Sequence, residues 1–452
     1  MKPRTISKLP TELLLQVFED VVEMAHSPST PFSGPYALSA VCWNWRYLLA
    51  CCPQLWTNIV IRHDPLIHPI QYKALKGRLQ YALLRSENHP LSITLAHSSP
   101  LLDTVLIAAT RWRLANLTIT GVEAAGLENY SFPLLQKCTV NLCSQDSLGS
   151  HTINAPALKH VAIQIPSPFN PLIFPWQQIT HLELELAFTD PLSRIIPPIP
   201  PPPVQSNPDR YPLPNLTYLH VNNYPEALEG LLTPQLRHVV LTTDRMIDTL
   251  ANSEWIYNRV ISLIIDSKCT IEIVEFRVPR YGVKLSNASV NSLLEWTPNV
   301  RELRFSVYDM VSLLSLDWWS IGNLPALQAV EALTIRVSKT VSNDPLVRSL
   351  TPMVSRDVID EEDLARVLGT PQAQWEKFVI QNDAFLHIIR EKLVSANLKV
   401  LNLNWDSSVY RDWYHTPRIS RRLRDIEGWI ERVTIPGVNF KEKLPVTITF
   451  PN

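Results

Sequence analysis

The sequence has 452 residues, and its 41 basic and 42 acidic side chains give a formal net charge of −1. This balance disfavours a chain whose main role is binding nucleic acid. Hydrophobic residues make up 46% and charged residues 18%, so we expect a large folded core rather than general disorder. With 38 Pro and only 11 Gly, a Gly-rich nucleotide-binding enzyme is also disfavoured.

The N-terminal segment does not predict a secretory signal, because polar residues such as Glu12 and Asp20 interrupt its apolar run. No stretch of about 18 apolar residues predicts a membrane span. The six cysteines, at positions 42, 51, 52, 138, 143 and 269, form no CxxC pair and no disulfide framework. We therefore expect a cytoplasmic or nuclear protein with reduced thiols and no membrane partner.

The first sixty residues predict a small helical domain. Pro10 and Glu12 suit the first turn of a helix, where a missing N–H is tolerated and an acidic side chain is favoured. Apolar residues then recur at helical spacing in two successive stripes. The stripes are Leu13, Leu14, Val17, Phe18, Val21 and Val22, then Ala37, Leu38, Val41, Trp45, Leu48 and Leu49. So small a unit cannot bury them all, so we expect a partner to cover some.

Four blocks in this region resemble the F-box motif, in the form found among fungal F-box-like proteins. They are Leu9-Pro10-x-Glu12-Leu13, Val17-Phe18, Val41-Cys42-x-x-Trp45-Arg46 and Pro53-x-Leu55-Trp56. Residues 83–95 continue the resemblance, whereas the loop at 24–35 is longer than in a compact F-box.

The resemblance implies docking on the Skp adaptor of a cullin–RING ubiquitin ligase. Carried over residue by residue, it implies adaptor contacts at Leu9, Pro10, Leu13, Val17, Leu38, Val41 and Trp45. The alternative for these residues is a purely structural role in the helical core, which is the role we expect for Phe18 and Trp56.

From residue 90 onward, the pattern apolar-x-x-apolar-x-apolar recurs. It falls at residues 114–119, 135–140, 158–163, 179–184, 216–221, 236–241, 260–265, 300–305, 330–335, 375–380 and 398–403. Several of the intervals match the 20–29 residues of a leucine-rich repeat, so each unit predicts one short strand of a stacked parallel sheet. The resemblance to leucine-rich repeats is degenerate, because among the rungs only Cys143 fits the Asn or Cys expected in the turn.

The predicted fold class is therefore α/β. A helical F-box-like domain at 1–60 and a linking helical segment at 61–89 precede a solenoid at 90–452. The solenoid is an irregular, leucine-rich-repeat-like stack with a curved parallel sheet, interrupted by a Pro-rich insertion at 191–214. A non-repetitive α/β domain is the alternative architecture. The insertion is either an inert surface loop or a docking site for an aromatic groove.

Residues between the apolar positions of a strand point away from the core, so they predict a binding face on the concave side. Histidine or tyrosine fills four successive rungs of one column. The column contains His160, His181, Tyr218 and His238, and His220 lies in the next. Rungs about 4.8 Å apart would place these rings nearly in a stack. We expect a protein substrate to bind there with pH sensitivity near neutrality; scattered exposed histidines are the alternative. Because no acidic or Cys ligand sits in the column, a metal site is disfavoured.

The common nucleotide, zinc-protease and serine-hydrolase motifs do not occur, so we expect no catalytic residues, no cofactor and no metal. The favoured function is a non-enzymatic substrate adaptor of a Skp–cullin–F-box ubiquitin ligase, which binds an unknown protein substrate. A scaffold without a role in ubiquitylation is the main alternative, and an enzyme with an unrecognised site is the third.

Overall fold

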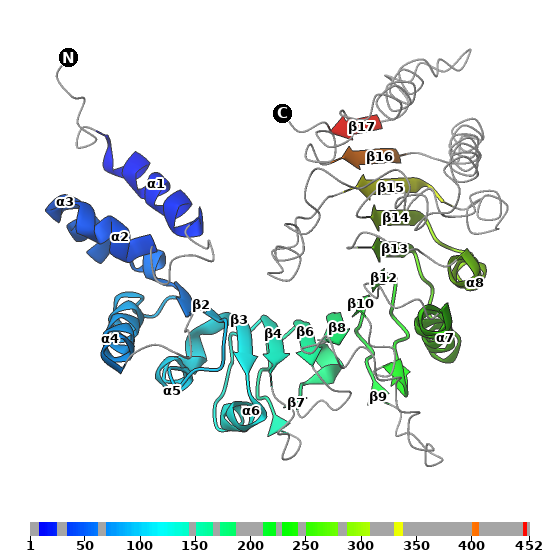
Figure 1. The fold of residues 1–452 in the computed structure, drawn as a ribbon, viewed down its shortest axis with the longest axis horizontal. Coiled ribbons are helices and arrows are strands. Elements are labelled where there is room, and N and C mark those ends of the chain that lie inside the picture. The colour runs from blue at the N-terminus through cyan, green and yellow to red at the C-terminus, as the bar shows by residue number, and fades with distance from the viewer. Residues whose placement is uncertain are drawn as a thin grey trace, which may run out of the picture. The chain divides into compact units, whose positions relative to one another are not determined.

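The fold is taken from a computed structural model, which describes residues 9–24, 34–61, 69–143, 151–165, 172–186, 211–222, 228–242, 250–278, 287–307, 330–337, 400–405 and 446–449. Its secondary structure is mixed α/β, with a large parallel sheet and several helices (Figure 1). By compactness the chain divides into two units. The first comprises Met1–Val204 and Pro212–Leu216, and the second Gln205–Tyr211 and Thr217–Asn452.

The first unit begins with three helices and a 3-10 turn. They are α1 (Thr11–Met24), α2 (Gly34–Val41), α3 (Trp43–Ala50) and η2 (Pro53–Trp56). The amide of Leu14 donates to the Pro10 carbonyl, which starts α1. Cys42 separates α2 from α3 with an extended backbone, and its Sγ caps α3 by accepting from the Trp45 amide at 3.5 Å. Leu14, Phe18, Leu49 and Trp56 form the core of this bundle.

A parallel ladder of strands follows in the same unit. The remaining elements are β1 (Asn58–Ile61), α4 (Pro69–Arg85), β2 (Leu91–Leu95), α5 (Leu102–Leu106), η3 (Ala109–Arg111), β3 (Trp112–Ile119), α6 (Gly121–Leu127), β4 (Lys137–Leu142), β5 (His151–Thr152), β6 (His160–Ile165), β7 (Leu172–Ile173), η4 (Trp176–Gln178) and β8 (His181–Leu186). The strands pair in the order β1-β2-β3-β4-β6-β8, all parallel. Helix α4 lies within residues 61–89, the segment that we expected to link two domains. Strand β1 of the ladder begins before that segment, at Asn58.

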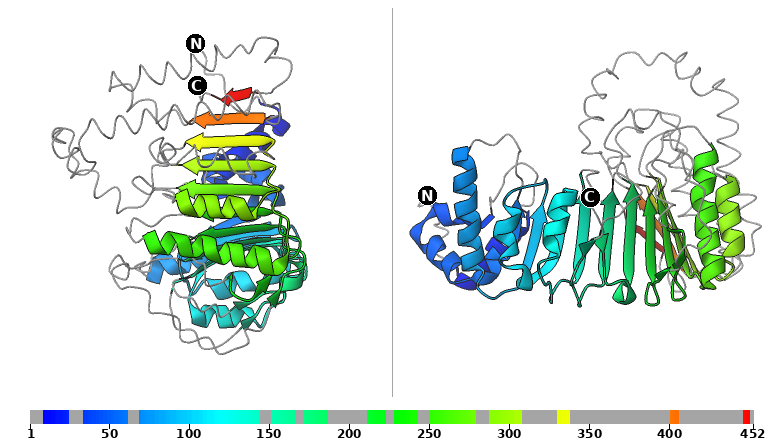
Figure 2. Two further views of the ribbon diagram at one scale, coloured as in Figure 1. Left: turned by 90° about the vertical axis from the view of Figure 1, so that its right-hand side faces the viewer. Right: turned by 90° about the horizontal axis from the view of Figure 1, so that it is seen from below.

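The second unit repeats this construction. Apart from β9 (Tyr211–Pro212), which spans the division, its elements are β10 (Tyr218–Asn222), β11 (Leu231–Leu232), β12 (His238–Thr242), α7 (Leu250–Ser267), β13 (Ile273–Val278), α8 (Asn287–Trp296), β14 (Glu302–Val307), β15 (Ala332–Val337), β16 (Val400–Trp405) and β17 (Val446–Thr449). The strands β10-β12-β13-β14-β15-β16-β17 are again parallel neighbours. Figure 2 shows these strands side by side, with α7 and α8 along one face of the sheet.

A recurring proline turn delivers the chain into many of these strands. In the sequence x-Pro-x-Leu, or x-Pro-x-Val, the amide of the fourth residue donates to the carbonyl of the first. The donor and acceptor residues are Leu135 and Phe132, Leu158 and Ala155, Leu216 and Leu213, Leu236 and Thr233, and Val300 and Thr297, at 3.0–3.2 Å. Pro fixes φ at the second position of such a turn, and the fourth residue is buried each time. The strand then starts at the same phase in these five repeats.

At several junctions between neighbouring strands, the carbonyl just before one strand accepts hydrogen bonds from two successive backbone amides at the start of the next strand. The Lys159 carbonyl accepts from Thr180 and His181, and the Glu272 carbonyl accepts from Arg301 and Glu302. This shared acceptor fixes the register of successive strands, so equivalent positions lie beside one another across each ladder. Alternate residues of each strand then lie on opposite faces of the sheet.

The apolar pattern predicted most of the described strands correctly, but in one case the predicted strand is a helix. Residues 260–265 were expected to form a strand, but they lie within helix α7, and the strand of that repeat is β13. Val260, Leu263 and Ile264 are all buried at spacings of three and four residues, which an α-helix also satisfies. The prediction was wrong because the apolar spacing alone fits both structures.

The rung at residues 114–119 is a strand, but its predicted register was wrong by two residues. Lys137 of β4 lies beside Leu114, and Asn116 lies beside Thr139. The buried series is Trp112, Ala115 and Leu117, in which a small alanine takes the place of a large apolar residue.

Other predictions lie outside the described residues. These are the rung at 375–380 and the part of the Pro-rich insertion before residue 211.

Candidate protein-binding surfaces

Helix α1 carries two neighbouring apolar stripes with opposite environments. Leu14 and Phe18 are 3% and 0% exposed and pack inside the bundle. Leu13 and Val17 on the next stripe are 48% and 44% exposed, and Leu9, just before the helix, is 42% exposed. Spacing of four keeps Leu13 and Val17 on one face of the helix. The unit thus buries one stripe and leaves the other in solvent.

The remaining residues expected to contact an adaptor differ in exposure. Val41 is 60% exposed at the end of α2, and Pro10 is exposed before α1. Leu38 is only 7% exposed, so it is part of the bundle core rather than its surface. Trp45 is half-buried and meets Phe18 edge-on, with ring centroids 4.8 Å apart. We use the name exposed apolar set for Leu9, Leu13, Val17 and Val41.

Sequence reasoning missed an exposed aromatic pair on α3. Trp43 and Tyr47 are 73% and 56% exposed, and their rings stack at 5.6 Å and 14°. An aromatic pair four residues apart on a predicted helix could have indicated this contact. Together with the exposed apolar set, the pair adds to the apolar surface that the N-terminal bundle exposes to solvent.

The polar face of the first ladder contains the predicted histidine contact. His160 of β6 and His181 of β8 are direct neighbours, and their rings stack at 4.1 Å and 16°. Desolvation by burial lowers the pKa of both rings, the positive charge of Lys137 lowers it further, and Glu183 opposes the shift. The pair is therefore neutral at pH 7, and its titration lies on the acid side of the range that we expected.

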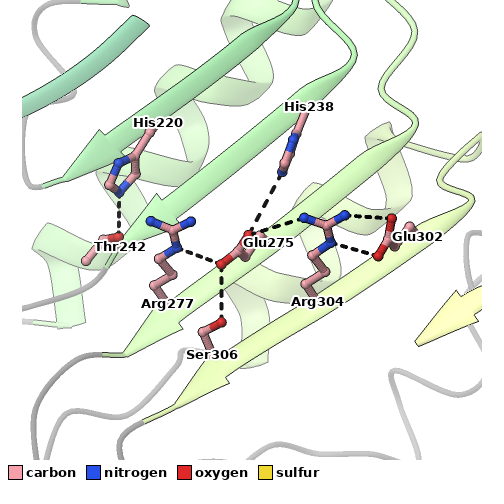
Figure 3. A network of polar contacts seen from close by, with 8 residues as sticks. All are labelled: His220, His238, Thr242, Glu275, Arg277, Glu302, Arg304 and Ser306. Atoms are coloured by element: carbon pink, nitrogen blue, oxygen red, sulfur yellow. Dashed lines mark hydrogen bonds and ion pairs between the residues drawn. The ribbon is translucent and has the colours of Figure 1, made fainter. Parts of the chain in front are cut away.

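Tyr218, His220 and His238 belong to the second unit. Tyr218 and His238 are neighbours on β10 and β12, but their rings meet edge-on at 4.7 Å and 87° rather than in a stack. His220 Nε2 lies 2.8 Å from Thr242 Oγ1, in a hydrogen bond whose direction depends on the tautomer (Figure 3). The five predicted residues are thus divided between two units, with three separate local arrangements.

Strands β12 to β14 carry a charged network around Glu275, which is shown in Figure 3. The Glu275 side chain is only 8% exposed, and its Oε1 accepts from Arg277 Nε at 2.6 Å and Ser306 Oγ at 3.2 Å. On β14, Arg304 donates from Nε and Nη2 to the two carboxylate oxygens of Glu302, both at 2.8 Å. We call Glu275, Arg277, Glu302, Arg304 and Ser306 the arginine–glutamate patch.

The charges in this patch determine its protonation. Burial alone would raise the pKa of Glu275, but the hydrogen bond and charge of Arg277, with Ser306 and Arg304, outweigh it and lower that pKa. Burial, assisted by Arg304, lowers the pKa of His238 to about 4. At pH 7 Glu275 and Arg304 are therefore ionised and His238 is neutral.

Glu275 was missed because the strand of its repeat was assigned to residues 260–265. A charged residue between apolar neighbours is also normally predicted to be exposed to solvent. Glu275 is instead buried, with hydrogen-bond partners from its own strand, β13, and from the next strand, β14.

Within the described ranges, no three His, Cys, Asp or Glu side chains are grouped so that they could hold a metal ion. No helix in those ranges is both long and apolar enough to cross a membrane. No protein-family model matches the chain, and no curated protein matches it closely enough to count as a relative.

Proposed function

We propose that this protein is a substrate-recognition adaptor of a Skp–cullin–F-box type ubiquitin ligase. Its N-terminal bundle docks on the Skp adaptor, and the polar faces of its ladders bind a protein substrate. The chain itself carries out no chemistry, which belongs to other subunits of the ligase. It works in the cytoplasm, the nucleus or both.

The observation that carries this proposal is the exposed apolar set. Leu13 and Val17 form a solvent-facing stripe on α1 beside a stripe that the bundle core already buries, and Leu9 is exposed just before the helix. Burying apolar surface contributes about 25 cal/mol per Å², so such a stripe favours association with an apolar partner. These residues also belong to the blocks that resemble the F-box motif.

The test is co-expression of the full chain with the Skp adaptor, followed by size-exclusion chromatography. Leu13→Asp with Val17→Asp places two charges on the stripe without touching the core. The matched control is Leu84→Asp with Ile107→Asp, at side chains that are 73% and 79% exposed in α4 and just after α5 of the same unit.

We expect the wild type and the control to elute with the adaptor, and the Leu13/Val17 variant to elute alone as a folded chain. If the folded wild type forms no complex, or if the complex survives both charges, the adaptor role is refuted. A non-enzymatic scaffold would then be the better account.

A further inference from the structure

Helix α4 has apolar residues on two sides, and the chain covers only one of them. Leu75, Leu79 and Ala82 are buried within the first unit. On the other side, residues spaced by four, three, four and three follow the whole length of the helix. We call them the outward stripe, and its exposed members are Ile70, Ala74, Gly77, Tyr81 and Leu84. This is the spacing with which one α-helix packs along another.

The two ends of the outward stripe are large and its centre is small. Ile70 and Leu84 are 74% and 73% exposed, and each lies seven residues from Gly77, or about 10 Å along the helix. A Cβ atom at Gly77 would meet no other atom within 4 Å, so packing inside the chain does not require glycine there. Glycine destabilises the middle of a helix relative to alanine, but it lets a second backbone come close.

The first unit holds α4 in place through the helix backbone. The Tyr36 hydroxyl donates to the Arg78 carbonyl in the middle of the helix. In its last turn, Arg111 Nη2 donates to the Leu83 carbonyl at 3.2 Å. The outward stripe is therefore presented by a helix that is already fixed, which reduces the entropy lost when a partner binds.

The charges along α4 indicate the kind of partner. The helix has no acidic residue, whereas its basic residues are Lys73, Lys76, Arg78 and Arg85. Lys73 and Arg78 border the outward stripe on opposite sides, and both are exposed. Residues 62–85 as a whole contain one acidic residue, Asp64, and one further basic residue, Arg62. The pairing of any single side chain therefore cannot remove the surplus of positive charge.

This surplus distinguishes between two possible occupants of the stripe. A second copy of α4 would bring basic side chains against basic side chains, which is unfavourable. A helix with Asp or Glu beside its apolar residues would bring opposite charges together, as the flanking positions of paired helices commonly do. The charges thus favour an acidic helix from another protein.

We propose that the outward stripe of α4 docks an amphipathic helix of a partner protein, in which Asp and Glu flank the apolar residues. A large apolar side chain of that helix lies over Gly77, between Ile70 and Leu84. Its acidic residues face Lys73 and Arg78. This inference goes beyond the proposed function, because it uses none of the residues of the exposed apolar set and assigns a second partner.

The test measures fluorescence anisotropy of a fluorescein-labelled peptide added to the purified full chain without any adaptor. The peptide has four heptads with Leu at positions a and d and Glu at positions e and g, where repulsion between Glu side chains disfavours self-pairing. The matched ligand control has Lys in place of each Glu.

Two variants change the stripe, and each has a matched control elsewhere in the unit. Gly77→Gln fills the open space at the centre, and Gly126→Gln does the same on α6, where a Cβ atom also meets nothing within 4 Å. Leu84→Asp places a charge on the stripe, and Ile107→Asp does so at a side chain that is 79% exposed after α5. Replacing a helical glycine with Gln favours the helix, so a loss of binding in Gly77→Gln is separate from unfolding.

We expect the Glu peptide to bind the wild type, and Gly77→Gln and Leu84→Asp each to weaken it about tenfold or more, as loss of a central contact in an interface implies. The two control variants should keep the wild-type affinity, and the Lys peptide should not bind. Leu13→Asp with Val17→Asp should also keep that affinity, because the adaptor and the peptide use different surfaces.

The inference is overturned if the Glu peptide does not bind, if the Lys peptide binds equally well, or if Gly77→Gln keeps the wild-type affinity. Equal losses in the control variants or in the Leu13/Val17 variant would also overturn it, because binding would then not be located on α4. Dimers of the wild type that Gly77→Gln abolishes would overturn it in favour of a second copy.

Discussion

The N-terminal bundle and the strand ladders differ in how far they bury their apolar side chains. In the ladders the large apolar residues at the inward positions, such as Leu158, Leu236 and Phe305, are completely buried. In the bundle Leu13, Val17 and Trp43 are between 44% and 73% exposed. The ladders complete their core by stacking repeats, whereas the bundle leaves part of its apolar surface exposed to solvent.

The largest expected difference between the regions concerns stability. Leu236→Ala empties a site that is 0% exposed, so we expect it to lower the free energy of unfolding by about 2–5 kcal/mol. Leu13→Ala removes the same atoms from a side chain that is 48% exposed, and its cost should stay within about 0.5 kcal/mol. Urea denaturation of both variants measures this contrast. Similar losses would mean that Leu13 is already covered within the chain.

A second contrast lies within the arginine–glutamate patch. Glu275→Gln leaves Arg277 beside a buried neutral group, and we expect a loss of about 1–3 kcal/mol. Glu302→Gln affects a side chain that is 24% exposed, so the loss should be below about 1 kcal/mol. Urea denaturation of both variants compares the two losses in unfolding free energy. A larger loss in Glu302→Gln than in Glu275→Gln would show that Glu275 does not organise the network.

Acid should weaken the second unit through the same network. The pKa of His238 is lowered to about 4, so the folded state resists a proton that the unfolded chain accepts at about 6.5. Its contribution to stability is complete above pH 6.5 and is lost as the pH falls toward 4. Glu275, whose pKa is also lowered, loses its contribution as the pH falls through that lowered value. Arg304, Arg277 and Glu302 are the other charges facing His238.

The measurement is the urea midpoint between pH 7 and pH 4. His238→Gln should reduce the decrease of the urea midpoint with falling pH, whereas His89→Gln, at an exposed histidine, should leave that decrease unchanged. An unchanged slope in His238→Gln would contradict the assigned neutral state of His238.

The smallest expected effect on stability is the coupling between the stacked histidine rings of the first ladder. A double-mutant cycle with His160→Ala and His181→Ala should give a coupling of about 0.5–1.5 kcal/mol, as for other ring pairs in contact. At pH 7 both rings are neutral, so the coupling should not depend on salt. A strong salt dependence would show instead that the rings are charged.

Sequence periodicity predicted the ladder because two constraints coincide in each repeat. The buried residue that ends a turn, as at Leu135 and Leu158, fixes where the following strand begins. Alternation along the strand then determines which of its residues are buried. The prediction was wrong at residues 260–265, where apolar residues three and four apart equally suit a helix. It also misplaced the register at Ala115, because a small residue gives a weak apolar signal.

The binding surfaces were harder to predict for a different reason. The contact between His160 and His181 follows from register alone, so it could be foreseen. The burial of Glu275 depends on Arg277 and Ser306, and no local pattern specifies that pairing. The burial of Leu38 and the exposure of Val41, three residues apart on one predicted stripe, depend on how the helices pack.

We propose that the Skp adaptor covers the exposed apolar residues of the bundle. Hydroxyl-radical footprinting of the full chain, with and without the purified adaptor, measures this side chain by side chain. We predict strong protection of Leu13 and Val17, and unchanged labelling of Leu84 and Ile107. Unchanged labelling of Leu13 and Val17 at saturating adaptor, or protection at Leu84 and Ile107 instead, would contradict the account.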